Sequence, residues 1–194
     1  MNKLASEFVG TGGTFYVMAR LAFEGFHAGL TYGNAQNVDI LVASPDGSRA
    51  LSIQVKTAWK ARRDRGRDGC RAPHHLEWTL GRKAAKIRHD NFFFAFVDLR
   101  KLRKDKIPDV YIVPAVVVAK HCEGWVDKAK MVRFHPSIEM MEPYKNNWQL
   151  LRDALSEGTA VHPNETALLS EEALAADWSR PEEEAAWSHL QPGK

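Results

Sequence analysis

Two short runs rich in β-branched residues, joined by a turn, constrain the fold of this chain more than any other feature. The runs are Val38–Val42 and Ala50–Thr57, and the segment between them, Ser44–Arg49, is rich in turn-forming residues. This pattern predicts a β-hairpin. Side-chain alternation should separate the aliphatic and polar residues of the second run onto opposite faces. The aliphatic residues are Leu51, Ile53 and Val55, and the polar residues are Ser52, Gln54 and Lys56.

Three polar side chains of this hairpin form the candidate catalytic site: Asp39, Gln54 and Lys56. A carboxylate within a strand is costly unless it has a partner. A carboxylate, an amide oxygen and an ammonium together suit a hard cation beside a phosphate. The alternative for such a trio is purely structural, with Asp39 paired to a neighbouring Lys and no catalysis.

The order of these residues, Asp followed by Gln-x-Lys, resembles the PD-(D/E)xK nuclease superfamily, and within it the Q-x-K branch. That branch includes group I intron-associated endonucleases and related uncharacterised bacterial proteins. The resemblance spans roughly residues 8 to 150. Further matching segments are Gly10-Thr11-Gly12-Gly13, Gly33-Asn34, Glu77-Trp78, Gly81-Arg82-Lys83-Ala84, Phe92 to Leu99 and Tyr111-Ile112-Val113-Pro114.

The resemblance implies a restriction-endonuclease-like α/β fold, in which helices flank a mixed central sheet. It implies that Asp39 and Gln54 bind Mg²⁺, for which Mn²⁺ can substitute, and that Lys56 holds the attacking water or the phosphate. One position departs from the family pattern. Thr14 aligns with a first-helix Glu that helps to hold the metal in relatives, and neither Glu7 nor Glu24 falls at the matching position.

Charge divides the chain into two parts. Residues 1–156 contain 25 Lys and Arg against 16 Asp and Glu, whereas residues 157–194 contain 2 against 8. We therefore expect a nuclease-like domain over 1–156 and an acidic C-terminal tail over 157–194, with at most one short helix. The basic domain predicts a nucleic-acid partner. The resemblance to endonucleases favours DNA over RNA, a choice that the charge pattern leaves open.

Basic residues after the hairpin are candidate phosphate contacts, because Arg binds phosphate bidentately. Two segments supply them, the loop that leaves Lys56 and a predicted helix at Gly81–Asp90. The candidate nucleic-acid-binding residues are Lys60, Arg62, Arg63, Arg65, Arg67, Lys83 and Lys86. Trp59 fits either base stacking or packing against the sheet.

The remaining elements follow from periodicity and turn signals. A glycine-rich lead at Gly10–Gly13 should open a helix over Thr14–Phe26. Its expected apolar face is Phe15, Met18, Ala19, Ala22 and Phe23. The apolar run Asn91–Leu99 predicts a central strand covered on both faces. Pro114 should open a helix with Ala115, Val118, Ala119 and Cys122 on one side.

Three functional classes fit these features: a metal-dependent nuclease, a non-catalytic nucleic-acid-binding module on the same fold, and a regulatory protein whose acidic tail occupies its basic surface. Two distant cysteines, Cys70 and Cys122, favour a reduced cytoplasmic protein. No apolar run is long enough to span a bilayer, and Met1–Glu7 lacks the apolar core of a signal peptide. The sequence leaves the oligomeric state open.

Overall fold

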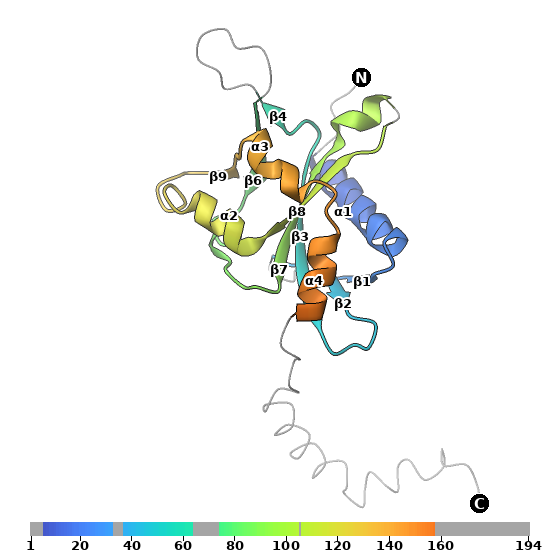
Figure 1. Ribbon diagram of the computed structural model, residues 1–194. Coiled ribbons are helices and arrows are strands. Elements are labelled where there is room, and N and C mark those ends of the chain that lie inside the picture. The colour runs from blue at the N-terminus through green and yellow to red at the C-terminus, as the bar shows by residue number, and fades with distance from the viewer. Residues whose placement is uncertain (1–5, 33–36, 64–73, 105, 158–194) are drawn as a thin grey trace, which may run out of the picture. The chain divides into compact units, whose positions relative to one another are not determined.

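The structure, a computed structural model, describes residues 6–32, 37–63, 74–104 and 106–157 (Figure 1). Its centre is a five-stranded sheet in the order β1-β2-β3-β7-β8. These strands are β1 His27–Leu30, β2 Ile40–Ala43, β3 Ala50–Ala58, β7 Phe92–Asp98 and β8 Asp109–Pro114. β3 and β7 are parallel and the other neighbours are antiparallel, so the sheet is mixed, as the sequence predicts.

Shorter elements surround this sheet. β4 Arg62–Arg63 pairs with β5 His75–Leu76, and β6 Trp78–Leu80 pairs with β9 Val132–Phe134. The α-helices are α1 Ser6–Phe23, α2 Ala115–Cys122, α3 Ile138–Met141 and α4 Gln149–Glu157. The 3₁₀ turns are η1 Ala84–Lys86, η2 Leu99–Lys104 and η3 Glu142–Tyr144. None of the helices within the described ranges is both long and apolar enough to cross a bilayer.

The strand β7 lies in the middle of two apolar layers, and all seven of its residues are buried. Its alternate residues enter different clusters. Phe93, Ala95 and Val97 pack with α1 and α4, whereas Phe92, Phe94 and Phe96 pack with α2, β6 and β9. Figure 1 shows α1 and α2 on opposite sides of the sheet. The predicted central strand covered on both faces is therefore confirmed.

The helix α2 also agrees with the sequence. Pro114 is its N-cap residue, and its buried residues are Ala115, Val118, Ala119 and Cys122. Cys122 is a free thiol, and burial raises its pKa to about 11. Such a thiol is protonated at neutral pH and acts as a small apolar side chain.

The helix α1 corrects two expectations. It begins at Ser6, so Gly10, Gly12 and Gly13 lie inside it rather than in a loop before it. Its buried residues are Gly13, Val17 and Leu21, whereas Phe15 and Phe23 of the expected core face are 59% and 86% exposed. The helix has apolar residues on two sides, and the side that packs on the sheet is the one that carries Gly13.

The predicted helix over Gly81–Asp90 is wrong except for one turn. Within this segment only Ala84–Lys86 is helical, as the 3₁₀ turn η1. Ala84 and Ala85 are buried there and hold the turn against the α2 layer.

The chain divides into two compact units, Met1–Gly158 and Thr159–Lys194. The predicted acidic tail, from residue 158 onward, lies outside the described residues.

Candidate active site

The candidate site lies where β3 extends beyond its neighbour β2. β2 pairs with β3 only from Ala50 to Ile53, whereas β7 pairs with β3 as far as Ala58. Asp39, the residue just before β2, occupies the position where this pairing ends. Its backbone N–H donates to the carbonyl of Ile53 at 2.9 Å, and its Oδ2 accepts from the backbone N–H of Val55 at 2.7 Å. The carboxylate thus satisfies a strand amide that would otherwise lack a partner.

Gln54 lies between the two residues that bond to Asp39. It pairs in register with Phe94 and is only 5% exposed. Its Oε1 is buried and has no hydrogen-bond partner. An unpaired buried amide oxygen costs roughly 1–3 kcal/mol, so its presence beside a carboxylate requires an explanation.

Lys56 projects from the same face of β3 as Gln54, as the alternation predicts. Val55, the residue between them, belongs to the opposite layer with α1. Burial lowers the pKa of the Lys56 ammonium, and the negative charge of Asp39 acts in the other direction and raises it. The ammonium is therefore partly desolvated within the electrostatic reach of the Asp39 carboxylate.

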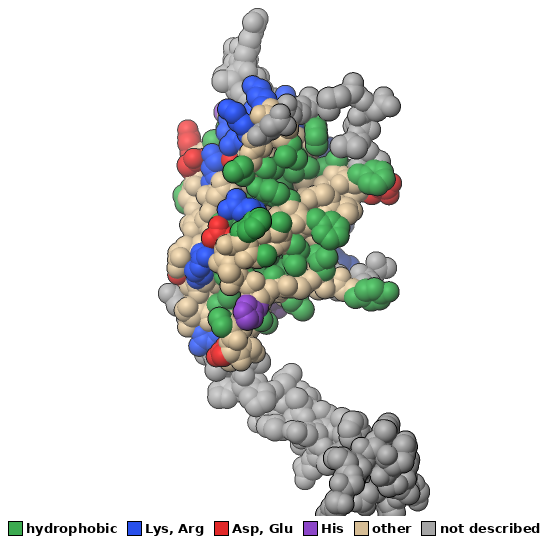
Figure 2. Space-filling view, turned by 90° about the vertical axis from the view of Figure 1, so that its right-hand side faces the viewer, with side chains coloured by type: hydrophobic (Ala, Val, Ile, Leu, Met, Phe, Trp, Pro, Cys, Tyr) green, Lys and Arg blue, Asp and Glu red, His purple; other side chains and the backbone are tan. Residues whose placement is uncertain are grey.

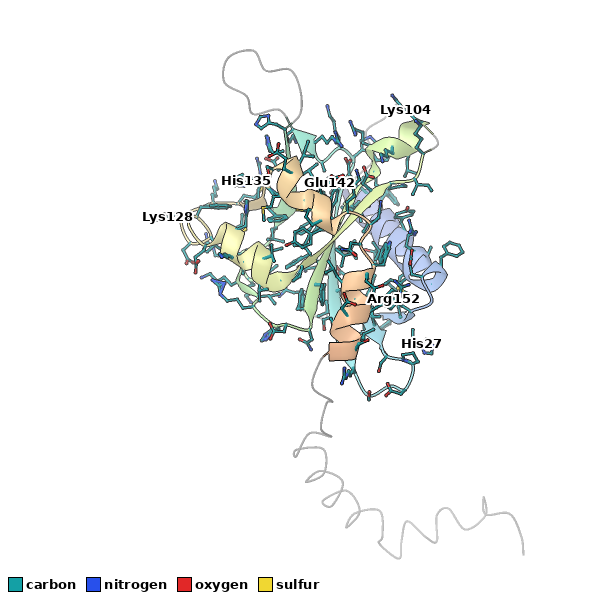
Figure 3. All side chains as sticks on the ribbon, in the orientation of Figure 1. His27, Lys104, Lys128, His135, Glu142 and Arg152 are labelled. Carbon is teal, nitrogen blue, oxygen red and sulfur yellow. The ribbon has the colours of Figure 1, made fainter. Side chains whose placement is uncertain are left out.

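No further acid among the described residues forms a metal-binding cluster with Asp39. Among the described residues no cluster of three or more His, Cys, Asp and Glu is arranged to hold a metal ion. Glu24 is committed to ion pairs with Arg20 at 3.0 Å and Arg152 at 3.1 Å, and its pKa is lowered mainly by the Arg152 hydrogen bond. Arg152 projects from α4 (Figure 3). Glu7 is exposed in the first turn of α1.

Helix α1 contacts β3 directly beside Lys56. A Cβ added to Gly13 would lie 1.9 Å from Oγ1 of Thr57, so only glycine allows this approach. Thr14, the next residue, donates its hydroxyl to the carbonyl of Gly10 at 3.2 Å. The hydroxyl of Thr14 is thus used within the helix.

The predicted phosphate contacts after β3 differ in exposure. Lys60 and Arg63 are exposed, whereas Arg62 is half-buried with a buried, unpaired Nε. Arg65 and Arg67 lie outside the described residues. Trp59 is partly buried against the layer that contains α1, which favours the packing alternative over base stacking.

The two predicted contacts of the Gly81–Asp90 segment lie on η1, beside α2. Lys83 is exposed, and Lys86 forms an ion pair with Asp127 at 2.6 Å. Both side chains of this pair are well exposed, so the pair contributes little stability. Lys86 must exchange this partner before it binds a phosphate.

One basic position escaped the sequence interpretation. Arg133, on β9, lies 3.6 Å from the carboxylate of Glu77, and Arg63 lies 3.7 Å from the same oxygen. Two guanidinium groups from distant parts of the chain thus converge. The alternation in β9, where Val132 and Phe134 are buried and Arg133 is exposed, is the signal that could have identified it.

This fold is similar to that of a solved nuclease. The solved structure of a bacterial homing endonuclease, I-Ssp6803I, is similar to it with a TM-score of 0.50, over 80% of this chain and 97% of that chain. The sequence identity is 15%, so the similarity is one of fold. No family model matches the sequence, and no curated protein matches it.

Proposed function

We propose that this protein is a metal-dependent endonuclease that hydrolyses phosphodiester bonds of DNA, with Asp39, Gln54 and Lys56 as its catalytic residues. The observation that carries the proposal is the buried, unpaired Oε1 of Gln54 on the stretch of β3 that bonds to Asp39, together with a partly desolvated Lys56 ammonium that interacts electrostatically with the Asp39 carboxylate. An unsatisfied polar atom next to a perturbed ionisable group is typical of sites whose ligand completes them.

The donor atoms fit a hard divalent cation. Asp39 offers a carboxylate and Gln54 an amide oxygen, and Mg²⁺ prefers oxygen ligands, with Mn²⁺ able to substitute. Asp39 would retain its hydrogen bond from Val55, which fixes the carboxylate in place. When bound, the cation supplies charge stabilisation at the phosphate and a more acidic water.

Lys56 has a separate task in this proposal. Its ammonium carries three donors and lies on the same face as Gln54, where it binds the scissile phosphate or orients the attacking water. Because burial removes solvent from the ammonium, its attraction to a phosphate is stronger than that of an exposed lysine.

DNA is the preferred substrate class in this proposal, because the structural neighbour is a homing endonuclease and because the body of the chain is basic. Lys60 and Arg63 are exposed near the end of β3 and supply the first phosphate contacts. Such contacts position a duplex without reading its sequence. We assign Arg62, Arg65, Arg67, Lys83 and Lys86 to the same proposed interface.

The second candidate function is a non-catalytic DNA-binding module on the same fold. The specific observation in its favour is the low negative charge of the site, where Asp39 is the single acid of the candidate trio and Thr14 supplies none. Mg²⁺ usually takes one or two carboxylates together with substrate phosphates, so one carboxylate is the lower bound.

A cleavage assay with matched variants separates the two functions. Wild type, Asp39→Asn and Thr14→Glu are incubated with plasmid and single-stranded DNA, with Mg²⁺, with Mn²⁺ and with a chelator. The nuclease proposal requires metal-dependent cleavage by wild type, its loss in Asp39→Asn, and equal or greater activity in Thr14→Glu. DNA binding without cleavage by wild type or by Thr14→Glu supports the binding module, and cleavage that survives the chelator refutes the proposed site.

A further inference from the structure

The outer face of α1 carries an exposed apolar stripe that packs against nothing in the described part of the chain. Its residues are Phe8, Gly12, Phe15, Ala19, Ala22 and Phe23, and all six are exposed. The three phenylalanines are 66%, 59% and 86% exposed. Figure 2 shows hydrophobic side chains gathered on the side of the molecule where α1 lies in Figure 1. An exposed apolar patch of this kind marks an interaction surface.

The spacing of this stripe is that of a helix that packs along another helix. Phe8, Gly12, Phe15, Ala19 and Ala22 follow one another at alternating intervals of four and three residues, which is the a/d repeat of a coiled coil. The stripe therefore stays on one side of α1 and drifts by only about 20° per heptad around a straight helix.

Gly12 leaves room for a close approach from outside. A glycine inside a helix costs roughly 0.5–1 kcal/mol relative to alanine. At Gly13 the contact with Thr57 accounts for that cost, but a Cβ at Gly12 would meet nothing within 4 Å. The same holds for Gly10, which lies off the stripe, so this observation shows only that the surface at Gly12 is open to a closely packed partner helix.

The stripe is complementary to itself under two-fold rotation. If two copies of α1 pack antiparallel with the axis beside Phe15, then Phe8 of one copy lies opposite Phe23 of the other. In the same register Gly12 lies opposite Ala19, and the two Phe15 side chains meet at the axis. A two-fold interface requires this kind of self-complementary pattern, with large residues and small residues each at matched distances from the centre.

The three phenylalanines alone supply about half of the area of a standard interface. A buried aromatic side chain removes roughly 150–250 Å² from solvent, so covering the three phenylalanines at their observed exposure buries on the order of 400 Å² per copy. A standard interface buries about 800 Å² per partner. Leu30 and Tyr32, which follow α1 and are 46% and 102% exposed, offer further apolar surface on this side of the sheet.

We infer that a second copy of this chain docks on the outer stripe of α1, forming a two-fold symmetric dimer through an antiparallel helix pair. The inference does not rest on the nuclease proposal, since its tests measure association and need no DNA and no metal.

Sedimentation velocity of the full chain across a wide concentration range tests the dimer. Wild type should show a concentration-dependent dimer, and Phe15→Glu should weaken the association by at least about 30-fold, because it places two like charges at a central position of the interface. The matched control is Ile107→Glu, which changes a 68% exposed apolar residue outside the stripe and should associate like wild type. A monomeric wild type, or a Phe15→Glu protein that dimerises normally, overturns the inference.

Gly12→Leu separates association from folding. The substitution has open space within one copy and removes a helix glycine, so the chain should fold at least as stably as wild type. The added side chain should nevertheless block the close approach of the second helix and abolish the dimer. If Gly12→Leu dimerises like wild type, the interface lies elsewhere.

Cysteine cross-linking tests the antiparallel register. In a Cys70→Ser background, Phe8→Cys and Phe23→Cys copies are mixed and oxidised, with Cys122 buried and out of reach. Disulfides between the two different copies should form preferentially. Preferential linkage of Phe8→Cys to itself contradicts the antiparallel pair.

A thiol reagent tests whether the chain covers its own stripe. If the Phe15→Cys protein is a monomer and its Cys side chain is shielded from the reagent, the chain itself covers the stripe and the dimer is overturned.

Discussion

Asp39 and Asp98 both place a carboxylate at a strand end of the same sheet, but their surroundings differ. Asp98, the last residue of β7, is 2% exposed and accepts backbone N–H donors from Ala61 at 3.2 Å and Arg100 at 3.1 Å. Arg100 adds an ion pair at 3.9 Å. Asp39 accepts one backbone donor, the N–H of Val55. Gln54, which precedes Val55 on β3, has a buried Oε1 without a partner.

This difference separates an acid that organises the chain from an acid that has capacity left for a ligand. At Asp98 the donors of the protein itself complete the carboxylate, and the bond to Ala61 fixes the chain that leaves β3. Near Asp39 the Oε1 of Gln54 has no hydrogen-bond partner, and the ammonium of Lys56 is partly desolvated. Sites that sacrifice local stability in this way are often functional. The following predictions test whether the two acids really differ in this sense.

The largest expected effect is on cleavage by Asp39→Asn. The amide keeps an acceptor for the Val55 N–H but removes the negative charge, so cleavage should fall by 10²–10³-fold or more while the fold is retained. Initial rates of plasmid nicking at saturating Mg²⁺ measure this loss. Asp98→Asn is the comparison. If both variants lose the same activity while the same fraction of each is folded, Asp39 and Asp98 do not differ in function.

Asp98→Ala should have the largest effect on stability. It leaves the backbone amides of Ala61 and Arg100 without their acceptor and removes the ion-pair partner of the Arg100 guanidinium, at a cost of about 2–4 kcal/mol in the free energy of unfolding. Urea denaturation measures this cost. Asp153→Ala is the matched control, because Asp153 is exposed on α4 and accepts a hydrogen bond from the exposed side chain of Gln149, so its loss should cost no more than about 0.5 kcal/mol.

Gln54→Leu should behave in the opposite way to Asp98→Ala. It replaces an unsatisfied buried amide with an apolar side chain of similar volume, so stability should rise by about 1 kcal/mol or stay unchanged, whereas metal-dependent activity should fall. Thermal melts with and without Mg²⁺, read beside cleavage rates, provide both quantities. A clear loss of stability in Gln54→Leu would mean that the oxygen has a structural partner in the folded protein.

The smallest effect concerns the pH dependence that Lys56 contributes. Burial lowers its folded-state pKa below the unfolded value, so the unfolded chain binds more protons between those two values. Stability from this group therefore rises as the pH increases through that alkaline window. Lys56→Met should remove this rise and should be no less stable than wild type at neutral pH, as urea denaturation at several alkaline pH values would show.

The sequence correctly predicted the elements whose hydrophobic pattern fits only one type of secondary structure. The run Phe92–Val97 is apolar throughout, which is the pattern of a strand covered on both faces. The helix α2 follows Pro114 and has a single apolar face. In both cases local preference and tertiary packing agree.

Helix α1 was predicted poorly because two patterns compete there. Glycine propensity favoured a loop at Gly10–Gly13, but packing of Gly13 against Thr57 outweighs it. The exposed stripe with Phe15 is more apolar than the buried side with Val17, and hydrophobicity alone does not reveal which side meets the sheet. An expectation based on one isolated chain therefore assigned to the core the residues that we infer to meet a second copy.

For the candidate site, alternation along β3 correctly placed Gln54 and Lys56 on one face. The hydrogen bond from Val55 to Asp39 could not be predicted, because it depends on β2 beginning only at Ile40, so that its pairing with β3 stops at Ile53 and leaves the Val55 amide open. Strand registers of this kind follow from three-dimensional pairing rather than from local sequence.

The hydrogen bond from Val55 gives Asp39 a role in folding as well as in the proposed site. Asp39 also secures the amide of Val55, so selection for folding alone would preserve an acceptor there after cleavage had been lost. In the proposed site Gln54 Oε1 instead binds the cation, and without a cation it is a buried oxygen that lacks a hydrogen-bond partner among the described residues. In descendants that have abandoned catalysis, drift should therefore reach position 54 before position 39.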